Sequence, residues 1–256
     1  MRRDPEIFAL LAVASMLSAQ PASADTVILR PVADTTLIQV APSNNLGASL
    51  FFNAGTTQNG TYNHGLLQFD PVSQIPLGAT IQSVTLVLNV VHQPVDGYNF
   101  GDFELARVLA PWLEGNKTGT PASPGFGATA SPGEATWQGW SQPGGDYAPQ
   151  PSSLQAVFRP GDSPYLFGNT SNMVADVQQW LNNPGQNHGW LLRPVDESVR
   201  FTARRFASRE DLNNAPELII DFVPVPEPTP LALAALGTVL YLRFRSRKDA
   251  ARVGKS

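Results

Sequence analysis

The 256-residue chain contains 17 basic and 21 acidic residues and no cysteine, which gives it a formal net charge of −4 at pH 7. The lack of cysteine excludes disulfides, thiol catalysis and metal sites with cysteine ligands. A net acidic chain also disfavours contacts with phosphate groups, so we expect no nucleic acid partner.

The first 24 residues are typical of a secretory signal peptide. Arg2 and Arg3 precede an apolar stretch over 7–17, and Ala22 and Ala24 supply the small residues of a cleavage site. We therefore expect export by the Sec route and cleavage after Ala24.

Residues 25–223 show the short, alternating apolar patterns of an all-β domain. The clearest pattern lies over 81–91, where apolar residues occupy every second position from 84 to 90. Shorter strands are expected at 26–30, 35–40, 50–53, 65–70, 103–109, 189–193, 199–206 and 217–223. Many short strands separated by Gly, Pro and Asn turns predict an antiparallel β-sandwich or jelly roll.

This region is more acidic than the whole chain suggests. It has nine basic and seventeen acidic residues, hence a formal charge of −8. Within it, Asp96, Asn99 and Asp102 offer the oxygen ligands that calcium prefers. Turn chemistry alone also explains Asp, Asn and Gly in such a segment. Calcium is therefore left open, and no other cofactor is expected.

Between positions 115 and 164, seventeen of fifty residues are Gly or Pro. This composition predicts an elaborated loop between two halves of the sandwich, with Trp137, Trp140 and Tyr147 as its large apolar side chains. A loop of this length either forms part of a binding surface or lacks fixed structure.

A helix is expected around 172–182, where the period-two pattern stops. Asn172 is the predicted N-cap, and Pro184 and Gly185 end the segment. The apolar residues recur at helical spacing: Met173, Val177, Trp180 and Leu181.

The last residues, 224–256, divide into a Pro-rich hinge, an apolar run over 229–242 and a basic end. Fourteen helical residues span about 21 Å, which is short for a stable membrane helix. A buried core helix is the alternative, but the terminal position and the basic end favour transient contact with the inner membrane. The residues that carry this pattern are Val225, Pro226, Glu227, Pro228, Arg243, Arg245, Arg247 and Lys248.

This tail resembles the PEP-CTERM sorting signal of Gram-negative bacteria that make extracellular polysaccharide. The resemblance implies processing by an exosortase-type membrane protease. It also implies a location at the cell surface or in the extracellular matrix of a biofilm.

The central region carries seven stretches that match one family in the family's order. They are Ala33-Asp34-Thr35, 65–70 (GLLQFD), 75–83 (IPLGATIQS), 112–115 (WLEG) with 135–137 (ATW), 174–180 (VADVQQW), 187–192 (NHGWLL), and 206–210 (FASRE) before 216–218 (PEL). Region 25–223 thus resembles the DNRLRE domain, also called carbohydrate-binding module family 96, although the hexapeptide of that name is absent. The resemblance implies a β-sandwich that binds polysaccharides such as alginate.

A sugar site of this kind would use aromatic faces for stacking and arginines for uronic acid carboxylates. The candidates are Tyr98, Trp140, Tyr147, Arg193, Arg204, Arg205 and Arg209. Packing is the expected role of Trp112, Trp137 and Trp180, and a solvated strand face also explains the arginines between 200 and 205. Arg209 is expected to pair with Glu210.

No hydrolase, metalloprotease, P-loop or dinucleotide motif occurs in the sequence, so we expect a protein that is not an enzyme. The favoured interpretation is an exported, non-catalytic, matrix-associated protein that binds extracellular polysaccharide. A structural or adhesion protein with a protein partner is the alternative. A polysaccharide hydrolase or lyase is the third, since sequence does not give the spacing of carboxylate pairs.

Overall fold

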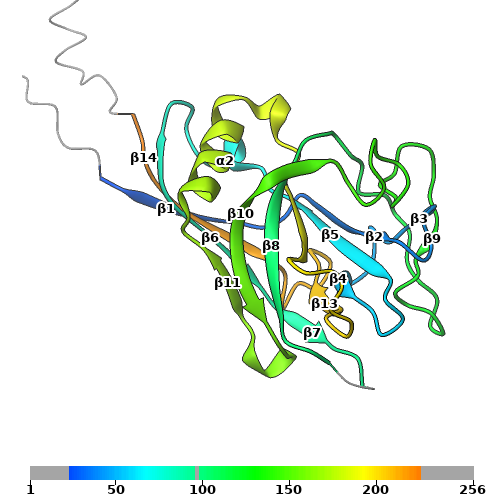
Figure 1. Ribbon diagram of the computed structural model, residues 1–256. Coiled ribbons are helices and arrows are strands. Elements are labelled where there is room, and N and C mark those ends of the chain that lie inside the picture. The colour runs from blue at the N-terminus through cyan, green and yellow to red at the C-terminus, as the bar shows by residue number, and fades with distance from the viewer. Residues whose placement is uncertain (1–22, 96–97, 226–256) are drawn as a thin grey trace, which may run out of the picture. The chain divides into compact units, whose positions relative to one another are not determined.

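Two antiparallel sheets pack face to face in the computed structural model, which describes residues 23–95 and 98–225 (Figure 1). The four-stranded sheet has the order β1 (Asp25–Leu29), β14 (Glu217–Val223), β6 (Thr80–Leu88) and β11 (Tyr165–Gly168). The eight-stranded sheet follows the path β10 (Tyr147–Val157), β8 (Gly101–Val108), β12 (Trp190–Pro194), β5 (Tyr62–Gln68), β4 (Phe51–Thr56), β13 (Arg204–Ala207) and β7 (Val90–His92), and β2 (Ala33–Ile38) also pairs with β5. The predicted antiparallel β-sandwich is confirmed.

Smaller elements complete the described chain. β3 (Asn44–Asn45) and β9 (Ala128–Thr129) form a two-stranded sheet, and the helix α2 (Ser171–Asn182) packs against β6 and β10. Short 3-10 turns are η1 (Pro71–Ser73), η2 (Pro160–Asp162) and η3 (Pro184–Gln186). Residues 24–224 belong to one compact unit.

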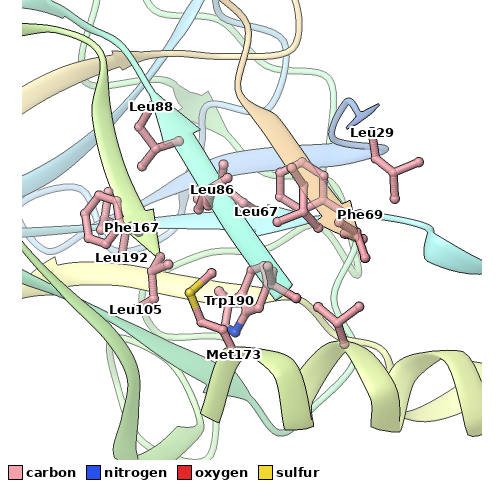
Figure 2. Packing of buried hydrophobic residues seen from close by; sticks show 14 of the residues in the cluster. Leu29, Leu67, Phe69, Leu86, Leu88, Leu105, Phe167, Met173, Trp190 and Leu192 are labelled. Atoms are coloured by element: carbon pink, nitrogen blue, oxygen red, sulfur yellow. The ribbon is translucent and has the colours of Figure 1, made fainter. Parts of the chain in front are cut away.

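The main core lies between the two sheets and is closed at one end by α2. Alternation along β6 points Leu86 and Leu88 inward, as the period-two pattern predicts (Figure 2). The predicted strand over 81–91 is interrupted at Asn89. Its first part pairs in the smaller sheet and its second part, β7, pairs with β13 in the larger one.

Some strands of the larger sheet are buried on both faces. Leu67 and Leu192 belong to the main core, whereas their neighbours Leu66 and Leu191 belong to a second cluster on the outer face. Successive residues of a strand point to opposite faces, so consecutive leucines mark a sheet that is covered on both sides.

The helix agrees with the prediction except for its cap. Met173, Val177, Trp180 and Leu181 are buried as expected. The N-cap is Thr170, whose Oγ1 accepts a hydrogen bond from the backbone N–H of Met173 at 3.1 Å. Asn172 was the wrong choice, because its side chain donates to the Pro151 carbonyl instead.

The Gly/Pro-rich segment contains a strand that its composition hid. β10 covers eleven residues, and its pairing with β8 shifts in register on both sides of Pro151. β10 lies at the edge of its sheet, where proline is tolerated because one side of the strand needs no partner. β11 was likewise not predicted.

The expected strand over 199–206 begins instead with a turn at 199–201, and only β13, at its end, pairs with neighbours. Phe201 has a φ of 65°, a left-handed conformation that a strand does not accommodate.

Two predictions fall on residues outside the described ones. These are the signal peptide, as far as Ala22, and the sorting tail from Pro226 onward. Within 23–95 and 98–225, the structure contains no helix with the length and apolarity needed to span a membrane.

Candidate functional site

Residues 109–146, which connect β8 to β10, cover the outer face of the larger sheet. Figure 1 shows this segment in green, with β9 within it, beside β2 and β3. Beneath it lies the second apolar cluster, which joins sheet residues to the loop residues Ala135 and Trp137. Four larger side chains pack around the edge of this cluster, each only partly buried: Tyr62, Trp112, Trp140 and Tyr147.

Hydrogen bonds give this segment a fixed conformation. The buried Asn45 side chain donates from Nδ2 to the carbonyls of Glu114 and Ala135, at 2.7 and 3.0 Å. Backbone bonds also join Ala135 to Leu113 at 2.8 Å and Gln138 to Pro42 at 3.1 Å. These bonds hold the segment to itself and to residues 42–45, so it forms a structured surface.

Two glycines let the segment pass close over the cluster. Gly144 and Gly145 have φ angles of 96° and 116°, which favour glycine. A Cβ on Gly144 would lie 3.0 Å from the Trp137 ring, and one on Gly145 would lie 2.7 Å from Cδ1 of Leu191. The backbone therefore packs where a side chain would not fit.

An open groove of about 560 Å³ lies on this surface. It is lined by 110–112, 129–136 and 138–141, together with Ser43 and Asp146. Trp112 and Trp140 supply its two large aromatic side chains, and both are partly exposed. Nε1 of Trp112 donates to the His188 carbonyl at 2.8 Å, which fixes the orientation of that ring.

Two carboxylates in the groove are held by backbone N–H groups. Burial opposes ionisation of Glu134, but hydrogen bonding from Ser131 and contact with Lys117 bring its pKa below the ordinary value. For Asp146, burial is again outweighed, and bonds from the backbone of Ser141 and Gln142, both 3.0 Å, lower its pKa. Both groups are therefore ionised at neutral pH.

Exposed polar groups lie between the aromatic and acidic residues. Ser43, Thr129 and Gln138 line the groove and are exposed. Aromatic faces combined with hydroxyl, amide and carboxylate groups can stack on a sugar ring and hydrogen-bond to its hydroxyls.

The predicted site residues do not converge on this groove. Trp140 lines it, whereas Tyr147 packs at the edge of the cluster beneath Arg193, whose Cζ lies 5.1 Å from the Tyr147 ring centre. Arg193 is held by Glu104 at 2.7 Å and by Glu197 at 3.3 Å.

Arg204 and Tyr98 lie in another part of the fold. Arg204 is 1% exposed, and its guanidinium donates to the carbonyls of Phe158, Phe201, Ala203 and Asn99. The ligand-binding role predicted for Arg204 is therefore replaced by a structural one. Its Cζ lies 5.6 Å from the ring centre of Tyr98.

Arg205 and Arg209 are also engaged by the protein. Arg205 stacks over Phe51, with 4.3 Å between its Cζ and the ring centre. Arg209 makes a two-bond pair with Glu114, at 2.6 and 2.7 Å, and the expected pair with Glu210 is present at 3.1 Å.

The predicted calcium ligands are incompletely described, because Asp96 lies outside the described residues. Asn99 donates from its backbone N–H and Nδ2 to the carbonyls of Phe201 and Arg200. Asp102 is exposed on β8. In the described part of the chain, no group of three or more His, Asp or Glu is arranged to hold a metal ion. Calcium binding at this segment stays a prediction.

Sequence reasoning missed several groove residues. Trp112 was assigned to packing because it lies in a matched stretch, and it both packs on the second cluster and lines the groove. Its position directly after Pro111 and just before the Gly/Pro-rich region 115–164 was the available signal. Glu134 and Asp146 gave no signal, since only the folded loop brings them together.

No protein-family model matches this chain, and no curated protein does either.

Proposed function

We propose that this protein is an exported, non-catalytic binding protein that holds extracellular polysaccharide in the groove beside Trp112 and Trp140. The observation that carries the proposal is the pairing of these two partly exposed rings with exposed polar side chains on a fixed surface. Indole faces stack on the C–H surfaces of sugar rings, and hydrogen-bonding groups around them orient the hydroxyls.

The open form of the groove supports a polymeric ligand. A polymer chain crosses an open surface, whereas small ligands bind mostly in enclosed pockets. The alternative function, a rigid spacer that binds a protein partner, would be favoured if the aromatic side chains of the loop were buried. Trp140 is instead partly exposed, which favours polysaccharide binding.

Export and sorting belong to the same proposal. They are supported by the N-terminal apolar stretch and by the Pro-Glu-Pro hinge, apolar run and basic end of the tail. An exosortase-type protease would process the tail and deliver the domain to the cell surface or matrix. Mass spectrometry of the mature protein tests this part, and a full-length C-terminus on the exported protein would contradict processing.

Affinity electrophoresis in gels that contain extracellular polysaccharides tests the binding. We expect retardation of the protein, and about tenfold weaker binding for Trp140→Ala, which corresponds to about 1.4 kcal/mol. Phe100→Ala is the matched control, because Phe100 is 55% exposed and lies outside the groove. Equal migration with and without every polysaccharide would refute the proposal.

A further inference from the structure

The charge of the groove restricts its ligand further. Among the described residues that line the groove, none is Lys, Arg or His, while Glu134 and Asp146 both lie in the lining. A ligand with a carboxylate on each residue would therefore meet negative charge without a cation to pair with.

Lys117 contacts two lining residues, but its ammonium group is already engaged. Nζ of Lys117 lies 3.4 Å from Glu134 Oε1 and donates to Ser131 Oγ and Asn116 Oδ1, at 2.8 and 2.6 Å. Lys117 thus offsets the charge of Glu134. No basic residue in the described chain forms an ion pair with Asp146, whose two oxygens accept backbone N–H groups.

Three of the arginines predicted to bind a uronate are already engaged or buried. Arg193 and Arg209 are paired with carboxylates of this chain, and Arg204 is buried. A second anion would have to compete with Glu104 at Arg193 and with Glu114 at Arg209, whose contacts are 2.7 and 2.6 Å.

We propose that the groove binds a neutral polysaccharide of hexose or N-acetylhexosamine units and rejects polyuronates such as alginate. This inference rests on the proposed function of the groove. The two carboxylates act as hydrogen-bond acceptors for sugar hydroxyls, Ser43, Thr129 and Gln138 add polar contacts, and the Trp faces stack on the rings.

Affinity electrophoresis of the exported protein distinguishes the ligands, with a neutral glucan, a neutral poly-N-acetylhexosamine, alginate, polygalacturonate and chitosan in separate gels. Retention on a neutral polymer, weakened at least fivefold in Trp140→Ala and little changed by added salt, is the expected result. Salt screens charge interactions but leaves stacking and hydrogen bonds with a neutral sugar largely intact.

Stronger retention on alginate, polygalacturonate or chitosan than on either neutral polymer would overturn the inference while leaving polysaccharide binding in place. Retention on none of the five would instead refute the proposed function itself. The two failures are therefore distinguishable.

A gain-of-function variant tests the charge argument independently. Gln138 is exposed in the lining, and its backbone rather than its side chain bonds to Pro42. Gln138→Lys should add retention on polygalacturonate at low salt, at least twofold over the parent, whereas the size-matched Gln138→Met should not. Equal polyuronate binding by both variants would count against the inference.

Discussion

His64 and Glu197 form a short contact of 2.5 Å between Nε2 and Oε1, beneath the loop that carries the groove. The other ring nitrogen, Nδ1, lies 2.6 Å from the carbonyl oxygen of Gly144. His64 thus bridges the carboxylate of Glu197 and the backbone carbonyl of Gly144. The pair thus fixes the position of the Gly144 backbone.

This contact predicts a dependence of stability on acid. Burial raises the pKa of Glu197, but bonds from His64 and Arg193 outweigh it, so the folded pKa lies below the ordinary 4.5. The stabilisation from a carboxylate of lowered pKa is complete above its ordinary value and is lost as the pH falls through the folded value. Urea midpoints measured at a series of pH values should therefore fall below about pH 4.5.

Glu197→Gln should cost about 2 kcal/mol at neutral pH, because it removes a charged partner from both His64 and Arg193. The variant should also lose less stability than the parent on acidification. Glu217→Gln, on the outer face of β14, is the control. A variant with the same acid slope as the parent would show that Glu197 does not produce it.

Asp34 should give the opposite pH dependence. Burial raises its pKa well above the ordinary 3.8, Glu114 and Glu210 raise it further, and a bond from the Arg209 backbone opposes them. A carboxyl whose pKa is raised in the folded state contributes its full stabilisation below the ordinary pKa. That contribution is lost as the pH rises through the pKa of the folded state. Asp34→Asn keeps an acceptor for Arg209 and removes the charge. For Asp34→Asn we expect a higher melting temperature at pH 7 and a stability that changes less with pH above 3.8. Asp25→Asn, at an exposed position, is the control and should leave both properties as in the parent.

Asp176 should hold the helix to the larger sheet. Its Oδ2 accepts hydrogen bonds from Ser152 Oγ at 2.5 Å and Trp190 Nε1 at 2.9 Å, and its Oδ1 lies 3.0 Å from Nε of Arg107. Asp176→Ala leaves buried donors without an acceptor and should cost about 3 kcal/mol in chemical denaturation. Asn182→Ala, exposed on the same helix, should change stability by less than about 0.5 kcal/mol. Equal effects of the two substitutions would argue against this role.

Gly145→Ala should disturb the groove without touching its lining. The new methyl group would meet Leu191 at 2.7 Å, on a backbone whose φ of 116° suits glycine. We expect a loss of about 1–3 kcal/mol in stability and reduced retention on polysaccharide. Gly161→Ala is matched, since a Cβ there meets no atom within 4 Å. Unchanged retention in Gly145→Ala would show that the loop position does not matter for binding.

The sequence by itself determined the sandwich, most of its strands and the helix. Alternation over β6 and helical spacing in α2 are local signals, because each follows from the geometry of one element. The consecutive leucines 66–67 and 191–192 likewise predict strands. Both leucines of each pair are apolar because the larger sheet is buried on both faces. Proline in β10 concealed a strand, because local composition does not show whether a strand lies at an edge.

Only the tertiary structure decided which side chains could form a site. Arg193 and Arg209 resembled ligand contacts in the sequence, but each also pairs with a distant carboxylate, Glu104 and Glu114, which lie 89 and 95 positions away. The groove likewise joins Ser43 to residues beyond position 110. Pairing across such separations depends on how the strands bring distant segments together, and no local pattern records it.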